Sequence, residues 1–204
     1  MPTPQSLWAE AIRPYGSKSP LMSALRGSSS SRWILIGPPP SSGDYSNGLP
    51  FSDEGASYFH EGLLKMSGWD THLHFIVVPV SIYGTKPCTA STAPVVSFLK
   101  TLAVKFPIKG IAVVGRLAYK FTLGEGRAAP ETVFRGMVRS PFFNYIPAYT
   151  FQEPSLAYVP APDKSSATRD ELNLYRQSFK NRQCLEQQYQ DFGILRRKIS
   201  GEVK

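Results

Sequence analysis

Few side chains in this sequence of 204 residues are of types that hold a metal ion or attack a substrate. His72 and His74 lie two positions apart on an expected strand edge, where they would share one face, and Asp70 is the one further ligand nearby. The only cysteines, Cys88 and Cys184, cannot build a four-ligand zinc site or a cysteine-ligated iron–sulfur cluster. No spacing of Ser, His, Asp or Cys indicates a nucleophilic triad. The sequence therefore predicts no metal and no cofactor.

Basic side chains point to a different chemistry, the binding of a polyanion. The chain has 23 Lys and Arg against 15 Asp and Glu, which gives a formal net charge of +8. Lys and Arg that neutralise phosphates release counterions, so a nucleic acid is a reasonable partner, although many small proteins are basic for solubility alone. Arg116, Lys120 and Arg127 lie just before, on and after one expected helix, where they could line the path of a nucleic-acid backbone. The glycine-containing run 124–127 is not a phosphate loop, because it follows a helix rather than a strand.

The elements that must position these residues follow from the hydrophobic pattern. Short apolar runs alternate with segments of helical spacing, which predicts crossover units and a parallel sheet covered on both faces by helices. The expected fold class is α/β, a three-layer sandwich with a central, mainly parallel four-stranded sheet. Ligands of such sheets bind beyond the carboxyl ends of the strands, so the loops there would share one functional rim. The expected strands are 33–36, 75–78, 110–115 and 142–149, the expected helices between them are 54–67, 91–106 and 117–123, and 41–53 is an expected loop.

The chain divides into three expected segments: a lead-in at 1–32, the α/β core at 33–160 and a C-terminal helical extension at 163–204. Apolar residues recur every three or four positions over 168–200, which predicts a long amphipathic helix or a helical pair broken near Gly193. This apolar stripe either docks on the core or binds a protein partner. The residues that we assign to partner binding are Phe179, Leu185, Tyr189 and Phe192.

Several motifs of the core resemble those of the uracil-DNA glycosylase superfamily, most closely the iron–sulfur branch found in thermophiles and many bacteria. The first expected strand and the residues after it are similar to that branch's G-E-x-P-G and G-x-P-F motifs. The segment 111–118 resembles its hydrophobic strand with L-G-x-x-A, and 146–150 lies where the family has F-P-T-Y-H-P. The resemblance covers roughly residues 33–156. The matching positions of the first two motifs are Gly37, Pro40, Gly48, Pro50 and Phe51.

The positions that carry the chemistry in this family differ here. Pro38 stands where the family has the glutamate of its first motif, Thr150 stands in place of the third-motif histidine, and the four cluster cysteines are missing. Cleavage of a glycosidic bond passes through a cation-like sugar and an anionic base, so it needs an anion or a positioned water on one side and a donor on the other. Asp44 could orient the water and Thr150 could donate a weak hydrogen bond, although a loop Asp more often caps a turn.

The resemblance implies that this rim meets DNA. Gly37 and Pro40 frame it, Phe51 matches the aromatic on which a flipped base stacks, and Phe151 could be an apolar wedge that enters the base stack. For Phe51 and Phe151, a role in the core is an equally good interpretation.

Three functions follow from these observations. The main prediction is a catalytically degenerate protein of the glycosylase fold that acts as a DNA-binding or DNA-associated module, with single- or double-stranded DNA as its partner. The first alternative is a protein-interaction component that uses the C-terminal helix. The second is an active DNA glycosylase whose rearranged site uses Asp44 and Thr150. No apolar run reaches the roughly 18 to 20 residues of a membrane span, and no export signal is visible, so we expect an intracellular protein of the cytoplasm or nucleoid with free thiols and no membrane partner.

Overall fold

The computed structural model describes most of the chain. The residues that it leaves undescribed are 1, 17–20, 54–61, 85, 124–134, 139–141, 144–145, 153–156, 158, 160, 163–164 and 201–204. All statements below concern the described residues.

A five-stranded sheet forms the centre of the molecule, with the strand order β2-β1-β3-β5-β4. Four of the strands are parallel and adjacent, and β4 pairs antiparallel with β5 at one edge. The α/β class and the four-stranded parallel sheet are thus confirmed, and the edge strand β4 is an addition. The strands are β1 (Trp33–Gly37), β2 (Phe75–Pro79), β3 (Gly110–Val114), β4 (Arg135–Val138) and β5 (Ile146–Phe151).

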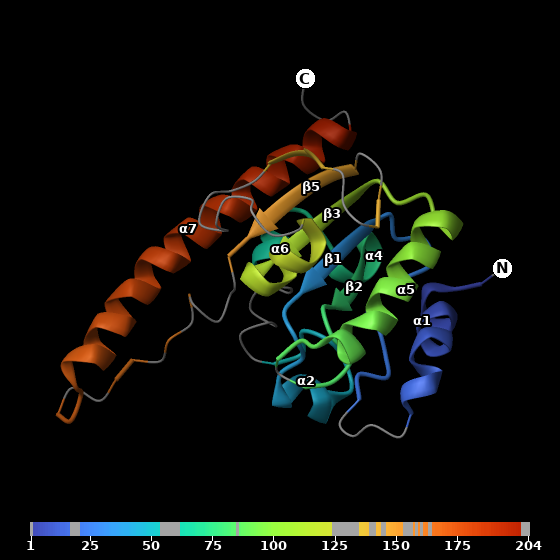
Figure 1. The fold of residues 1–204 in the computed structure, drawn as a ribbon. Helices are drawn as coiled ribbons and strands as arrows, with labels where there is room; N and C mark the ends of the chain where they lie inside the picture. Colours follow the sequence, from blue (N-terminus) through green and yellow to red (C-terminus); the bar gives the residue numbers. More distant parts are fainter. Residues whose placement is uncertain are drawn as a thin grey trace.

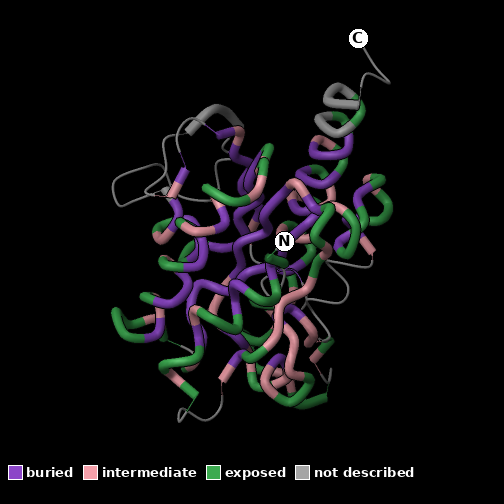
Figure 2. Tube along the Cα trace, turned by 90° about the vertical axis from the view of Figure 1, so that its right-hand side faces the viewer, coloured by how far each residue is buried: buried purple, intermediate pink, exposed green. Residues whose placement is uncertain are grey.

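Helices cover both faces of this sheet (Figure 1). Side chains alternate along the strands, so each of the four parallel strands contributes to two separate cores. The first core packs against α1 (Pro4–Ile12), α5 (Thr89–Lys105) and α6 (Gly115–Leu123). The second packs against α7 (Arg169–Ser200) and the segment 62–69. Figure 2 shows the buried residues running through the middle of the molecule, with exposed residues at its outer turns and helix faces.

The helix α7 is one continuous helix of 32 residues, so the alternative of a break near Gly193 is wrong. Gly193 is buried, and a Cβ added there would lie 2.9 Å from the carbonyl oxygen of Ser67. The glycine therefore allows close packing of the helix on the segment 62–69 rather than a bend. The C-terminal half of α7 lies along the sheet, whereas its N-terminal half projects beyond it (Figure 1).

Two short helices replace structures that the sequence pattern predicts differently. The helix α2 (Ser42–Asn47) lies within the expected loop 41–53, because Ser41 and Asp44 form a capping box at its start. The helix α4 (Thr71–His74) contains the two histidines expected on a strand edge, because the Asp70 side chain accepts hydrogen bonds from the backbone of His72 and Leu73 and caps a helical turn. A short 3-10 helix, η1 (Arg13–Tyr15), follows α1. Most of the expected helix 54–67 lies outside the described residues.

Candidate nucleic-acid interface

The topological switch point of the sheet lies between β1 and β3. The chain leaves β1 to form β2 on one side, and β3 pairs with β1 on the other. After Gly37 the chain enters the proline stretch 38–40, and after Val114 it enters α6 at once through Gly115, whose φ is +82°. The segment after β1 and the N-terminus of α6 therefore leave neighbouring strand ends. This is the position at which open parallel sheets bind their ligands.

The Phe51 ring is packed against Gly37 at this position. Phe51 is only 5% exposed and has a φ of +56°, a left-handed conformation that is uncommon for a bulky residue. A Cβ added to Gly37 would lie 1.3 Å from the Cζ atom of Phe51, so the ring occupies the space where a side chain of residue 37 would be. Pro40 is buried as well. In this structure Phe51 is a core residue, and a base could stack on it only if the ring moved.

The Asp44 carboxylate holds the segment after β1 in place. It is 6% exposed. Its Oδ2 accepts from the backbone N–H of Ser41 at 3.0 Å, and its Oδ1 accepts from the backbone N–H and the hydroxyl of Ser52 and from the backbone N–H of Asp53. Both carboxylate oxygens are therefore engaged in fixing the turn that carries Phe51. This geometry matches the turn-capping role rather than the orientation of a water molecule.

Thr150 and Phe151 are both fully buried in β5. Thr150 pairs with Val113 and follows the alternation of the strand onto the face of the first core. Phe151 lies in the second core, where its ring stacks on Tyr189 with a centroid distance of 4.6 Å. Thr150 therefore lies on the opposite face of the sheet from Phe51, and Phe151 closes the core instead of forming an accessible wedge.

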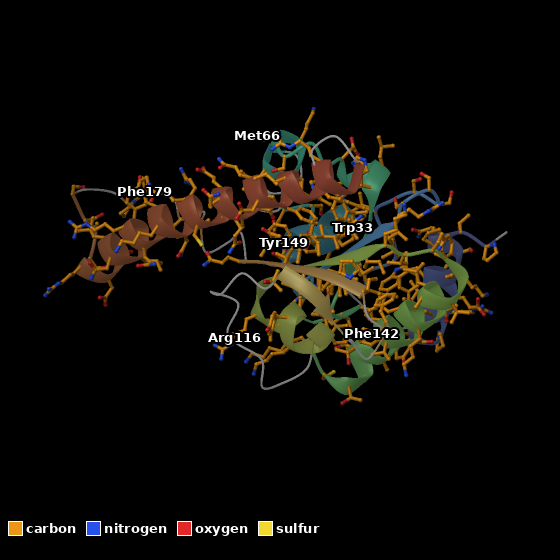
Figure 3. The ribbon with its side chains drawn as sticks, turned by 90° about the horizontal axis from the view of Figure 1, so that it is seen from above. Trp33, Met66, Arg116, Phe142, Tyr149 and Phe179 are labelled. Carbon is orange, nitrogen blue, oxygen red and sulfur yellow. The ribbon has the colours of Figure 1, made fainter. Side chains whose placement is uncertain are left out.

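Exposed basic side chains remain at the switch point, on α6. Arg116 and Lys120 are both exposed and stand four residues apart, so they share one face of the helix. Leu117 beside them is 46% exposed. We call Arg116, Leu117 and Lys120 the α6 ridge. Figure 3 shows Arg116 on the outer side of α6, away from α7. Arg127, the third basic residue of the sequence prediction, lies outside the described residues.

Three of the four residues assigned to partner binding form part of the core, which corrects that assignment. Leu185, Tyr189 and Phe192 are buried in the second core. The ring of Phe192 stacks on Trp69 at 4.6 Å, and burial raises the pKa of Tyr189 well above its ordinary value. Phe179 differs, because it lies on the projecting half of α7 and is 46% exposed (Figure 3).

Cys88 is a chemically distinctive residue that the sequence reasoning did not single out. It is exposed and stands immediately before α5, where its Sγ lies 3.5 Å from the hydroxyl of Ser91. Hydrogen bonds from the side chain and then from the backbone of Ser91 lower the pKa of the Cys88 thiol. The signal that could have revealed it is a cysteine followed by Thr-Ala-Ser at the start of a helix, since helix N-termini favour the thiolate.

We expect this lowered pKa to appear in the pH dependence of alkylation. At a pH below the ordinary thiol pKa, Cys88 should hold more thiolate than an unperturbed cysteine and react faster with iodoacetamide. Replacing Ser91 with Ala removes the largest cause, so its profile should move to higher pH. Peptide mass spectrometry of Cys88 across a pH series measures both profiles, with thermal unfolding as the check on folding. Superimposable profiles of the parent and Ser91→Ala would contradict this account.

Comparison of the chain with known protein families and with curated proteins finds no match. Among the described residues, no group of three or more His, Cys, Asp or Glu side chains is arranged to hold a metal ion. Within that same part of the chain, every helix is too short or too polar to cross a membrane. The described part of the candidate site thus offers basic side chains on a helix surface, while the carboxylate and the hydroxyl predicted to act on a substrate are buried.

Proposed function

We propose that this protein binds nucleic acid as a DNA-associated module and does not excise bases. The observation that carries the proposal is the α6 ridge, where Arg116 and Lys120 lie exposed on one helix face beside the topological switch point. Two cations on one face with an exposed leucine between them suit a phosphate backbone rather than a small substrate. The net charge of +8 supports a polyanionic partner. The motif resemblance to uracil-DNA glycosylases supports DNA as that polyanion and their fold as the origin of the scaffold.

The positions of the candidate catalytic groups support the proposal that the protein does not excise bases. Loss of a single donor to a developing anion typically costs about 10²–10³ in rate, so a reaction that lacks both its anion and its donor would be slow. Both carboxylate oxygens of Asp44 accept hydrogen bonds from its own turn, and Thr150 lies on the other face of the sheet from Phe51. We therefore favour binding over catalysis.

The test is fluorescence anisotropy with short labelled DNA at several salt concentrations. We expect the parent protein to bind with a steep salt dependence. The double variant Arg116→Ala/Lys120→Ala should bind more weakly, and its plot of log affinity against log salt for duplex DNA should be shallower by about 1.8, since each neutralised phosphate contributes about 0.9.

The matched control is Lys65→Ala/Lys180→Ala, which removes the same charge from two exposed lysines beside the second core and on α7. This control should leave the slope nearly unchanged. Equal slopes for the two double variants would show that charge alone, and not the α6 ridge, governs binding. Uracil-containing DNA incubated with the protein and then treated with alkali should remain intact, and strand breaks at uracil would establish the glycosylase alternative instead.

A further inference from the structure

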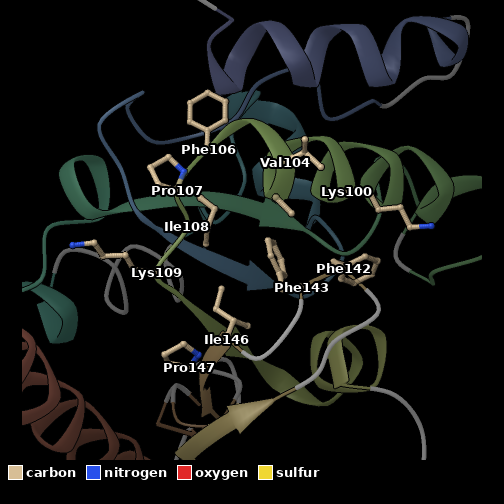
Figure 4. A pocket seen from close by; sticks show the side chains of 11 residues that line it. Lys100, Val104, Phe106, Pro107, Ile108, Lys109, Phe142, Phe143, Ile146 and Pro147 are labelled. Atoms are coloured by element: carbon tan, nitrogen blue, oxygen red, sulfur yellow. The ribbon is translucent and has the colours of Figure 1, made fainter.

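A second basic surface lies at the end of the sheet opposite the α6 ridge, near the amino ends of β3 and β5. A groove with a volume of about 770 Å³ runs there between the end of α5 and the residues that precede and begin β5 (Figure 4). Its lining is mixed, polar and apolar, and includes the half-buried rings of Phe106 and Phe142. Lys100 and Lys109 line it as well, and in Figure 4 their side chains extend outward on two different sides. We call this hollow the amino-edge groove.

A smaller hollow of about 500 Å³ adjoins the amino-edge groove. The two share Phe106 and Pro107, so these two residues form the divide between them. The smaller hollow is lined by Arg32 and Lys105. The backbone N–H of Lys109 donates to the carbonyl oxygen of Arg32 at 2.7 Å, which fixes the two hollows relative to each other.

Among the described residues that line these two hollows, all the charged ones are cations: Arg32, Lys100, Lys105 and Lys109. The Arg32 guanidinium is held in place, because its Nη1 donates to the carbonyl oxygens of Ser29 and Ser31. Spread-out cations of this kind match an anion that is itself extended.

The geometry also selects against a small anion such as free phosphate. The surface lies at the C-terminal end of α5, where backbone carbonyls and the helix dipole repel negative charge. A compact anion would therefore be held by lysine side chains alone. An extended chain of phosphates can reach several of these side chains at once without approaching the helix end.

The aromatic rings of the groove further restrict the class of ligand that it fits. Phe106 and Phe142 are half-buried in this groove, and Val104, which also lines it, is 87% exposed. Single-stranded nucleic acids bind to surfaces that combine cations for the phosphates with aromatic rings for the bases, whereas the bases of a duplex are already stacked on one another. Phe142 also lies 5.2 Å from Phe121 of α6, so the groove borders the helix that carries the α6 ridge.

We propose that the amino-edge groove binds single-stranded nucleic acid, with bases stacked on Phe106 or Phe142 and phosphates on Lys100 and Lys109. The inference rests on the proposed function for the class of ligand, but it concerns a different surface and a different form of that ligand. It assigns single-strand preference to the groove and leaves duplex contacts to the α6 ridge.

The experiment compares a labelled 12-nucleotide oligothymidylate with a labelled DNA duplex by fluorescence anisotropy. The groove variant Lys100→Ala/Lys109→Ala should lower the slope of log affinity against log salt for the single strand by about 1.4, since each neutralised phosphate of a single strand contributes about 0.7. Phe106→Leu keeps the apolar packing but removes the aromatic face, and it should weaken single-strand binding by at least about fivefold. Both variants should change duplex affinity by less than about twofold, as should the control Lys65→Ala/Lys180→Ala for both ligands.

Each remaining outcome decides between the two proposals. If the groove variants bind the single strand like the control while Arg116→Ala/Lys120→Ala weakens duplex binding, the groove inference is overturned and the proposed function stands. If the parent protein binds neither DNA, both fall. If polyglutamate displaces the oligothymidylate at equal charge concentration, the groove is a general anion surface and the stacking proposal is overturned.

A second measurement does not depend on the folding of any variant. Oligonucleotides that carry 5-bromouracil should crosslink on irradiation to the peptides that contain Phe106 or Phe142. Crosslinks confined to α6 or α7 would overturn the assignment of the groove.

Discussion

Removal of residues 166–204 should unfold the core instead of releasing an independent tail. Leu185, Tyr189 and Phe192 of α7 fill the second core against the sheet. Loss of one such large buried side chain typically costs about 2–5 kcal/mol. Loss of all three would therefore exceed much of the roughly 5–15 kcal/mol by which a domain is usually stable. Circular dichroism and thermal unfolding of the truncated chain are the measurements, and a cooperative transition at the parent's midpoint would refute this role of α7.

One single and one double variant compare the buried half of α7 with its projecting half in the intact chain. Phe192→Ala should lower the free energy of unfolding by about 3–5 kcal/mol, because Phe192 packs against Trp33, Trp69 and Tyr149. The double variant Leu174→Ala/Phe179→Ala changes two exposed side chains on the projecting half of α7. It should lower the free energy of unfolding by less than about 1 kcal/mol. If α7 binds a protein partner through this projecting half, the double variant should lose that partner without loss of folding.

The sheet could be predicted from the sequence because buried parallel strands carry a strong local signal. The runs around Ile34–Ile36, Phe75–Val78 and Gly110–Val114 are continuous and apolar, and all three form strands with fully buried patterns. The strand β4 was missed because Arg135–Val138 is short and lies at an antiparallel edge, where an apolar run is not required. The helical turn at Thr71–His74 was missed because its cause is a single capping side chain, Asp70.

Site residues were harder to predict, because the sequence alone does not distinguish an aromatic or acidic residue that packs in the core from one that contacts a ligand. The motif resemblance assigned Phe51 to the rim but could not show that its ring covers Gly37. Asp44 was recognised as a potential turn cap, yet only the structure shows donors on both of its oxygens. The amino-edge groove could not be predicted from the sequence, because Lys100, Lys109 and Phe142 come together only through the packing of separate elements.

Gly37→Ala should be among the most damaging single changes in the chain. The added Cβ would overlap the Phe51 ring, with 1.3 Å to Cζ and 1.8 Å to Cε2, so the buried ring would have to leave its place. We expect a loss of about 3 kcal/mol in the free energy of unfolding, at the upper end for overpacking. The control Gly48→Ala meets no atom within 4 Å and bears only the strain of its φ of +69°, which should cost about 1–2 kcal/mol.

The double variant Gly37→Ala/Phe51→Ala tests the contact itself. Without the ring, the new Cβ has room, so the double variant should be about as stable as Phe51→Ala alone, and the cycle should give a coupling of about 3 kcal/mol. Chemical denaturation of the four proteins supplies these values, and additive costs would mean that the ring does not lie on Gly37. A large coupling would instead establish that the rim at the switch point is closed by its own aromatic residue. In that case the nucleic acid that we propose as ligand would contact this protein beside the rim, at surfaces such as the α6 ridge, and not by stacking a base on Phe51.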